Sequence, residues 1–169
     1  MTITGTADAG PPDAVLQMAL TAELPAREFG AHIGQLALPA HRVPPTLTVH
    51  ALDALFRADS SLRFVVMDGE DAPALVSRSW FDVAMTGRLG YGRLVHQRRR
   101  LREVLPGGTL VFPADRPVAE VAAAVIRRRT GSSNLLDGVV VTTEDGALGV
   151  APVTAVFEQL AQQLSLIHI

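Results

Sequence analysis

Apolar residues in the first half of the chain follow two spacings, one typical of helices and one typical of strands. Residues 48–58 place their large apolar side chains on one face at helical spacing. The apolar runs RFVVM and PALVS, separated by a turn at Asp68-Gly69, predict a β-hairpin. The expected order is a helix over 48–58, strands over 63–67 and 73–77, and a helix over 78–86 that ends at Gly87.

The second half of the chain repeats this order. An extended GTLVF segment precedes Asp115 and Pro117, two residues typical of a helix start. The run GVVVT and the turn Glu144-Asp145-Gly146 predict a second hairpin. The expected elements are a strand over 108–112, a helix from 115 to about 129, a loop over 130–137, strands over 138–142 and 147–151, and a helix from about 153 to 164.

Two offsets superimpose the halves on each other. An offset of 69 residues places Val49 on Val118 and Leu52 on Val121. An offset of 75 residues aligns the hairpins and last helices, pairing Phe64–Val66 with Val139–Val141, Leu75 with Val150, and Phe81 with Val156. A hairpin flanked by two helices cannot bury its sheet alone. We therefore expect an α/β protein of two β-α-β-β-α repeats packed about a pseudo-twofold axis.

The residues before the repeats predict a leader and a linker. Residues 1–12 are rich in Thr, Ala, Gly and Pro and predict a mobile leader, and Asp13 is suited to cap a helix over 14–24. Three prolines and one glycine over 33–45 predict an extended linker. The chain shows neither a secretory signal nor an apolar run of about 20 residues. A cytoplasmic location without a membrane partner is expected.

Composition and charge exclude several classes of function. Hydrophobic residues make up 48% of the chain, which supports a buried core. The chain has 15 basic and 17 acidic side chains, and this balance argues against a nucleic-acid partner. The chain has no cysteine, which excludes disulfides, thiolate catalysis and cysteine-based zinc sites. Every basic residue is arginine, so a Walker lysine and Schiff-base chemistry are excluded as well. No metal site is expected from the five histidines, and no catalytic residue is assigned.

A few polar residues near the predicted junction of the repeats are candidates for ligand binding. Ser77, at a strand end, is suited to bond either a ligand or the start of the following helix. Arg78 is either a contact for an anionic ligand between the repeats or a solvated surface arginine. Arg93 lies on the connector between the repeats, beside an arginine cluster at 98–102. This cluster and the one at 127–129 are interpreted as solvated faces or salt-bridged dimer edges.

The two repeats resemble the tandem CBS domain pair, also called a Bateman module. The resemblance rests on ALVSR at 74–78, Trp80-Phe81, YGR at 91–93, and DGALGV at 145–150, and it covers about residues 33–164. It is closest to the CBS pairs that precede GGDEF-type diguanylate cyclase domains in bacterial signalling proteins. The resemblance implies a regulatory module without catalytic activity in this portion, whose last helix transmits a signal to a downstream domain that makes cyclic-di-GMP.

CBS repeats that bind adenine nucleotides typically contain a G-x-x-T-x-x-D pattern. This chain departs from that pattern. The threonine and aspartate positions hold Ser77 and Trp80 in the first repeat, and Pro152 and Ala155 in the second. Neither repeat therefore offers a ribose-binding carboxylate. No cofactor is assigned, and the ligand class to test is a nucleotide or another small anion. The candidate ligand-binding residues are Thr48, Ser77, Arg78, Arg93, Thr143 and Thr154.

The same resemblance suggests an organisation and a partner. We expect a leader and helix over 1–32, a first repeat with connector over 33–100, and a second repeat with output helix over 101–163.

The tail LSLIHI over 164–169 matches the translation of a sequencing-library adapter, and the alternative is a natural apolar helix end. CBS pairs imply a homodimer, for which Trp80, Phe81 and Met85 are interpreted as a dimer face, with the core as the alternative. A ligand-free dimerisation scaffold or a stand-alone CBS protein is the alternative function.

Overall fold

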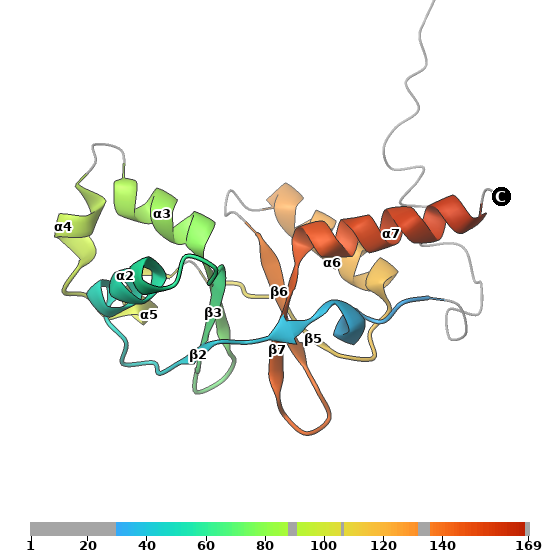
Figure 1. Cartoon of the computed structure of the whole chain (residues 1–169), viewed down its shortest axis with the longest axis horizontal. Coiled ribbons are helices and arrows are strands. Elements are labelled where there is room, and N and C mark those ends of the chain that lie inside the picture. Colours follow the sequence, from blue (N-terminus) through green and yellow to red (C-terminus); the bar gives the residue numbers. More distant parts are fainter. Residues whose placement is uncertain (1–29, 88–90, 106, 132–135, 168–169) are drawn as a thin grey trace, which may run out of the picture.

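The computed structural model describes residues 30–87, 91–105, 107–131 and 136–167. These residues form an elongated molecule in which two helix-and-sheet lobes lie side by side (Figure 1). The leader, the helix expected over 14–24 and part of the loop over 130–137 lie outside the described residues.

The first lobe is a three-stranded sheet covered by two helices. Strand β2 pairs in parallel with β3, and β3 pairs with β4 in the predicted antiparallel hairpin. Thr48 Oγ1 accepts a hydrogen bond from Ala51 N and thereby starts the first helix, while Gly87, at φ 59°, ends the last one. The elements are β2 (Arg42–Val43), α2 (Val49–Ala58), β3 (Phe64–Met67), β4 (Ala74–Ser77) and α3 (Arg78–Thr86).

The second lobe has the same order of elements and one additional strand. Its sheet has the strand order β1-β7-β6-β5, and β5 pairs in parallel with β6. The additional strand is β1 (Leu38–Pro39), which pairs antiparallel with β7. The other elements are β5 (Val111–Pro113), α6 (Val118–Gly131), β6 (Gly138–Thr142), β7 (Leu148–Pro152) and α7 (Val153–Ile167). The prediction of an α/β fold of two β-α-β-β-α repeats is confirmed.

Each lobe is completed by the segment that precedes the other lobe in the sequence. The segment with the 3₁₀ turn η1 (Ile33–Leu36) bonds to the start of α6 through Val118 N to Ala31 O, 3.0 Å. The segment leading into α5 (Leu101–Val104) bonds to the start of α2 in the same way, through Val49 N to Arg99 O, 3.0 Å. Ile33 and Leu101 are fully buried in the two cores.

This exchange of segments bears on two expectations from the sequence. The prediction of a purely extended linker over 33–45 is wrong in part, because the segment contains η1 as well as β1 and β2. The domain boundaries at residues 33 and 101 stay predictions.

Three apolar clusters hold the molecule together. One lies under α2 and α3, and it contains the fully buried Leu52, Val65 and Phe81. A second lies under α6 and α7. The third joins the two sheets through Val66, Val140 and Val150, with Phe64 and Leu75 against it. The repeats therefore bury one sheet face against their own helices and the other face against each other.

Phe81 and Met85 belong to the core of the first lobe, where they are 0% and 2% exposed. Trp80 is half-buried and packs against the same core. The interpretation of Phe81 and Met85 as a dimer face is therefore wrong, because these side chains are already covered within one chain.

The predicted alignment of the repeats is confirmed in the helices and is wrong by one residue in one strand. Val49 and Val118 begin α2 and α6, as the offset of 69 requires. Val66 and Val140 both face the other repeat, which gives β3 and β6 an offset of 74 instead of 75. The extra residue lies in the second hairpin turn. A shift of one residue moves side chains to the opposite face of a strand. The three consecutive valines of β6 do not indicate in the sequence which side chain faces the helices and which faces the other repeat.

Candidate junction site between the repeats

The two sheets are in close contact around Gly138, at the start of β6. A Cβ atom at this position would lie 3.1 Å from Leu75 Cδ2 and 3.2 Å from Phe64 Cε1. Beside this contact, Leu75 N in β4 donates to Thr109 Oγ1 in the segment before β5, at 2.9 Å. The junction is therefore a close-packed apolar contact with polar bonds at its side.

Ser77 is the predicted site residue that the structure places at this junction. It is 6% exposed, and its Oγ accepts a hydrogen bond from Trp80 N at 3.1 Å, which caps α3. The same hydroxyl donates to Asp137 Oδ2 of the other repeat at 2.7 Å. Ser77 thus combines the helix-capping role with a contact between repeats.

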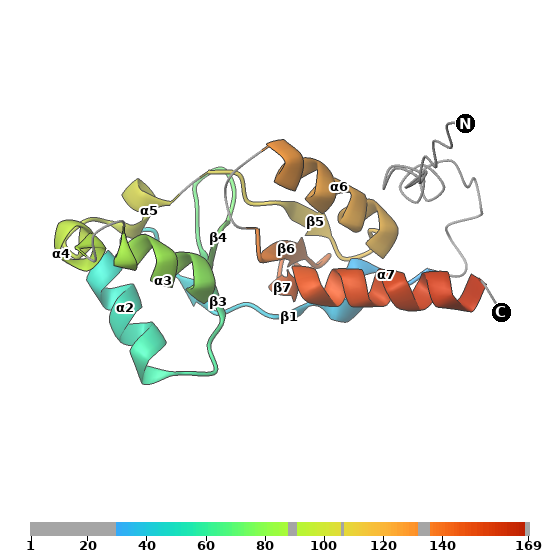
Figure 2. The ribbon, with the colours of Figure 1, turned by 90° about the horizontal axis from the view of Figure 1, so that it is seen from above.

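Asp137 connects the starts of two helices. Its carboxylate meets the cap of α3, and its backbone carbonyl accepts a hydrogen bond from Val153 N, the first residue of α7, at 2.9 Å. The views in Figures 1 and 2 show α3 and α7 starting near the middle of the molecule and running outward in opposite directions. One residue therefore touches the beginning of both helices.

Arg78 follows Ser77 but faces a different part of the lobe. Its guanidinium donates to Leu62 O at 2.8 Å, to Phe56 O at 2.7 Å, and to Asp59 O. The guanidinium also lies over the Phe56 ring, 4.8 Å from its centroid. These contacts tie the carboxyl end of α2 to the following loop, a position where a cation stabilises the helix dipole. A ligand-binding role for Arg78 stays a prediction.

Thr48 and Arg93 lie in the first lobe. Thr48 caps α2 through its side chain. Arg93, in α4 (Gly92–His96), forms an ion pair with Asp53 of α2 at 3.2 Å, and Arg57 pairs with the same carboxylate at 2.9 Å. Both predicted residues therefore have roles in holding α2, and their ligand-binding roles stay untested predictions.

Thr143 and Thr154 lie in the second lobe, and both are exposed. Thr143 is in the hairpin turn, where its Oγ1 donates to Asp145 and lies 3.2 Å from Ala147 O. The bond from Thr143, followed by one from Ala147 N, lowers the pKa of Asp145. Thr154 is in the first turn of α7. The six predicted residues are thus spread over both lobes and are not gathered into one site.

Sequence reasoning missed two residues of the junction, Thr109 and Asp137. Asp137 is 60 positions away from Ser77 and Thr109 is 34 positions away from Leu75, so no local spacing connects either pair. The repeat alignment offered no signal either, because the counterpart of Asp137 in the first repeat is Arg63. Arg63 O accepts from Arg78 N just as Asp137 O accepts from Val153 N.

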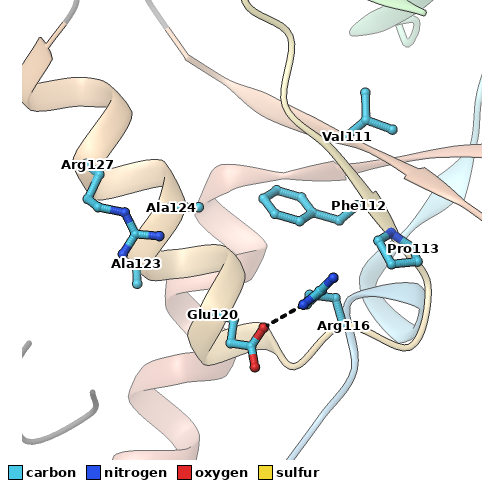
Figure 3. A pocket seen from close by; sticks show the side chains of 8 residues that line it. All are labelled: Val111, Phe112, Pro113, Arg116, Glu120, Ala123, Ala124 and Arg127. Atoms are coloured by element: carbon cyan, nitrogen blue, oxygen red, sulfur yellow. Dashed lines mark hydrogen bonds and ion pairs between the residues drawn. The ribbon is translucent and has the colours of Figure 1, made fainter. Parts of the chain in front are cut away.

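A separate open pocket of about 400 Å³ lies between β5 and α6. Figure 3 shows the Phe112 ring between the strand and the helix, with the Arg116–Glu120 ion pair at one end and Arg127 further along α6. Arg116 Nη1 and Glu120 Oε2 are 3.1 Å apart. The lining combines two arginines and one glutamate with an apolar floor formed by Val111, Phe112 and Pro113.

The described ranges also bear on metal sites and on membrane-spanning helices. Within them, no three or more His, Asp or Glu side chains gather in a way that suits a metal ion. Nor does any helix in these ranges combine the length and hydrophobicity needed to cross a bilayer.

Comparison with known proteins gives a likeness in structure but not in sequence. No protein-family model and no curated protein sequence matches the chain. A structure of CBSX2 in complex with AMP has a TM-score of 0.55 at 15% identity, covering 79% of this chain and 98% of that one.

Two further structures show the same likeness. A CBS domain-containing protein of unknown function from Bacillus anthracis has a TM-score of 0.59 at 13% identity, covering 80% of this chain and 96% of that one. The cytosolic domain of the Mg²⁺ channel MgtE in complex with ATP has a TM-score of 0.54 at 18% identity, covering 76% of this chain and 48% of that one. At these identities the likeness concerns the fold, and the chain has the fold of tandem CBS-domain proteins.

Proposed function

We propose that the chain is a non-catalytic regulatory module of a bacterial signalling protein, with α7 as its output helix. One observation carries the proposal: the first residue of α7 bonds to Asp137, whose carboxylate bonds to Ser77 of the other repeat. A change in the angle between the repeats would therefore act directly on the start of α7. A ligand drives such a change only if it binds one arrangement better than the other.

A small anion is the ligand class that we propose for the module. CBSX2 and MgtE are similar in fold, and their structures hold AMP and ATP respectively. In this chain, the pocket between β5 and α6 offers the guanidinium of Arg116 beside the apolar side chains of Val111 and Phe112, a combination that suits such a molecule if Glu120 gives way to it. Nucleotides and smaller anions with an apolar body are therefore the first ligands to test.

For the output we propose a GGDEF-type diguanylate cyclase in a cytoplasmic homodimer. The support is the resemblance of residues 74–78 and 91–93 to CBS pairs that precede such domains. Amplifying the source DNA beyond codon 163 tests this part. A GGDEF domain in the same reading frame would support the proposal, and its absence from that frame would overturn the assignment of this output.

The second candidate function is a ligand-free dimerisation scaffold. The bond between Ser77 and Asp137 favours it, because a polar group that could receive a ligand at the junction is already paired within the chain. In this alternative the module fixes the distance between partner domains, and no small molecule changes it.

A distance measurement on α7 separates the two functions. The chain lacks cysteine, so the variant Ala54→Cys with Gln162→Cys places one spin label on α2 and one on α7, both at exposed positions. The distance is measured by pulsed electron spectroscopy, with calorimetry recording whether AMP, ATP or benzoate binds. A ligand that binds and changes the distance supports regulation through α7. A ligand that binds without changing it, or the absence of binding by all three, favours the scaffold.

An Arg116→Ala variant in the labelled protein tests the proposed pocket. Loss of both binding and the distance change would place the ligand between β5 and α6. The matched control is Arg57→Ala, which removes an exposed arginine from the other lobe and is expected to leave binding unchanged.

A further inference from the structure

We propose that the outer end of the first lobe, residues 91–104 with α4 and α5, is a docking surface for an anionic lipid bilayer. The proposal goes beyond the regulatory function above and does not depend on it. Figures 1 and 2 show α4 at one end of the elongated molecule, while α7 runs toward the opposite end. A bilayer bound at the outer end would therefore leave α7 free to contact another domain.

Three apolar side chains of the outer end are exposed. Tyr91, Leu94 and Val95 are 63%, 68% and 64% exposed. Leu94 and Val95 follow Tyr91 by three and four positions, which places them on its side of α4. Large apolar side chains that are exposed as a group mark a contact with a partner, whereas single exposed ones are common on any protein surface.

The same stretch carries a strong positive charge. Residues 91–104 contain five arginines and one glutamate. Two of the arginines are in ion pairs, which are Arg93–Asp53 at 3.2 Å and Arg99–Glu103 at 3.6 Å. The other three are exposed and, in the part of the chain that the structure describes, form no ion pair: Arg98, Arg100 and Arg102. These three cations are available to an anionic partner.

The fold holds the apolar face and the arginines together at the outer end. Helix α4 packs closely on α3, since a Cβ atom at Gly92 would lie 2.6 Å from the carbonyl oxygens of Ala84 and Met85. The segment that leads into the arginines is bonded to the start of α2 through His50 N to Gln97 O at 3.1 Å. Both features are therefore anchored to the helices of the first lobe, and neither has to be assembled when a partner binds.

Charge and shape together favour a bilayer over other partners. A second copy bound through the same surface would bring two sets of arginines together, and like charges repel. Leu94 and Val95 are aliphatic, so they cannot stack on bases as the aromatic side chains of nucleic-acid-binding surfaces do. A projecting end fits a flat surface, where apolar side chains enter the headgroup layer and guanidinium groups meet lipid phosphates. This contact needs no helix that crosses the bilayer.

Vesicle binding by the full chain tests the charge of the surface. The protein is sedimented with vesicles of equal parts phosphatidylglycerol and phosphatidylcholine, and with vesicles of phosphatidylcholine alone. We expect binding to the anionic vesicles only, and weaker binding as salt is added. Arg98→Gln with Arg102→Gln is expected to weaken this binding by roughly tenfold or more. The matched control is Arg42→Gln with Arg63→Gln, which removes two exposed arginines outside the outer end and is expected to bind nearly as the natural chain does.

A second pair of variants tests the apolar side chains and the orientation. Leu94→Ser with Val95→Ser leaves the charge unchanged and is expected to weaken binding by roughly tenfold, with a circular dichroism spectrum like that of the natural chain. The chain has no cysteine, so Leu94→Cys carries a single nitrobenzoxadiazole label at the outer end. Its emission is expected to shift to the blue on anionic vesicles. The same label at Gln162→Cys, an exposed position of α7, is expected to show no shift.

Several outcomes would overturn the proposal. They are no binding to anionic vesicles, undiminished binding by either double variant of the outer end, and equal emission shifts at the two labelled positions. Binding to polyglutamate or to duplex DNA without binding to vesicles would assign the surface to an acidic protein or a nucleic acid, and would overturn it as well. None of these measurements uses a small ligand or the distance between α2 and α7, so a failure here is distinct from a failure of the regulatory function.

Discussion

Ser77 Oγ and Asp137 Oδ2 lie 2.7 Å apart, although 60 positions separate them in the sequence. The bond crosses the junction of the repeats and is half-buried there, where a hydrogen bond to a charged group is stronger than between neutral groups. Because Asp137 also accepts the first N–H of α7 through its carbonyl, the pair connects the starts of α3 and α7. The stability of the junction and the position of the start of α7 therefore involve the same two residues.

Replacing Ser77 with alanine is expected to lower the free energy of unfolding by about 2–3 kcal/mol. The variant loses the cap of α3 and leaves the Asp137 carboxylate without its donor. Urea unfolding followed by circular dichroism measures the change. In a double-mutant cycle with Asp137→Ala, a coupling energy of about 1 kcal/mol or more is expected for a direct bond, and additive effects would contradict the bond.

Replacing Arg78 with methionine is expected to lower the free energy of unfolding by about 2 kcal/mol. The variant keeps the length of the side chain but leaves the carbonyls of Phe56, Asp59 and Leu62 without their charged donor. Arg57→Met is the matched control, because that side chain is 65% exposed and forms only a surface ion pair with Asp53. Its expected cost is below about 0.5 kcal/mol, and equal costs in the two variants would show that Arg78 is a solvated surface residue.

Replacing Gly138 with valine is expected to destabilise the junction by about 1–3 kcal/mol, as overpacking in a core does. Side-chain atoms of Leu75, Phe64 and Val150 lie 3.1–3.3 Å from the position of a Cβ atom at Gly138. Gly107→Val is the control, since no atom lies within 4 Å of a Cβ atom there. Thermal unfolding of both variants decides the question, and an unchanged melting temperature for Gly138→Val would mean that the sheets do not approach closely at this point.

The parts of the fold that depend on local pattern were predictable from the sequence. The helix expected over 48–58 is found as α2 with Thr48 as its cap, because capping and helical spacing act within a few residues. The hairpin expected over 63–77 is found as β3 and β4 for the same reason. Both signals are complete within a short window of sequence.

The parts that depend on contacts between distant segments were not predictable. Ile33 is buried in the second lobe and Leu101 in the first, and no periodicity indicates that these segments are exchanged. The candidate site could be predicted only in part for the same reason. Ser77 was found because strand ends before helices favour hydroxyl caps, whereas Asp137 has a role only through a partner in the other repeat.

The hairpin turn of the second lobe gives a prediction that depends on pH. The bond from Thr143 Oγ1, and then the bond from Ala147 N, hold the pKa of Asp145 below its ordinary value. A carboxyl group whose pKa is lowered by folding stabilises the protein above its pKa in the unfolded chain, and this contribution is lost as pH falls through the folded-state pKa. Thr143→Val removes the first of these bonds, so the pKa of Asp145 is expected to rise toward its ordinary value. Carboxyl carbon resonances followed by NMR from neutral to acidic pH measure the shift.

Asp59 provides an internal reference for that titration. Its pKa is lowered mainly by the Ser61 hydroxyl, in the loop after α2 of the other lobe. Thr143→Val is therefore expected to leave the pKa of Asp59 unchanged, and Ser61→Ala is expected to raise it without affecting Asp145. A rise of both values in Thr143→Val would indicate a general loosening of the fold, and an unchanged pKa of Asp145 would show that Thr143 does not bond to it in solution. Only a rise confined to Asp145 agrees with a local bond that acts within one turn.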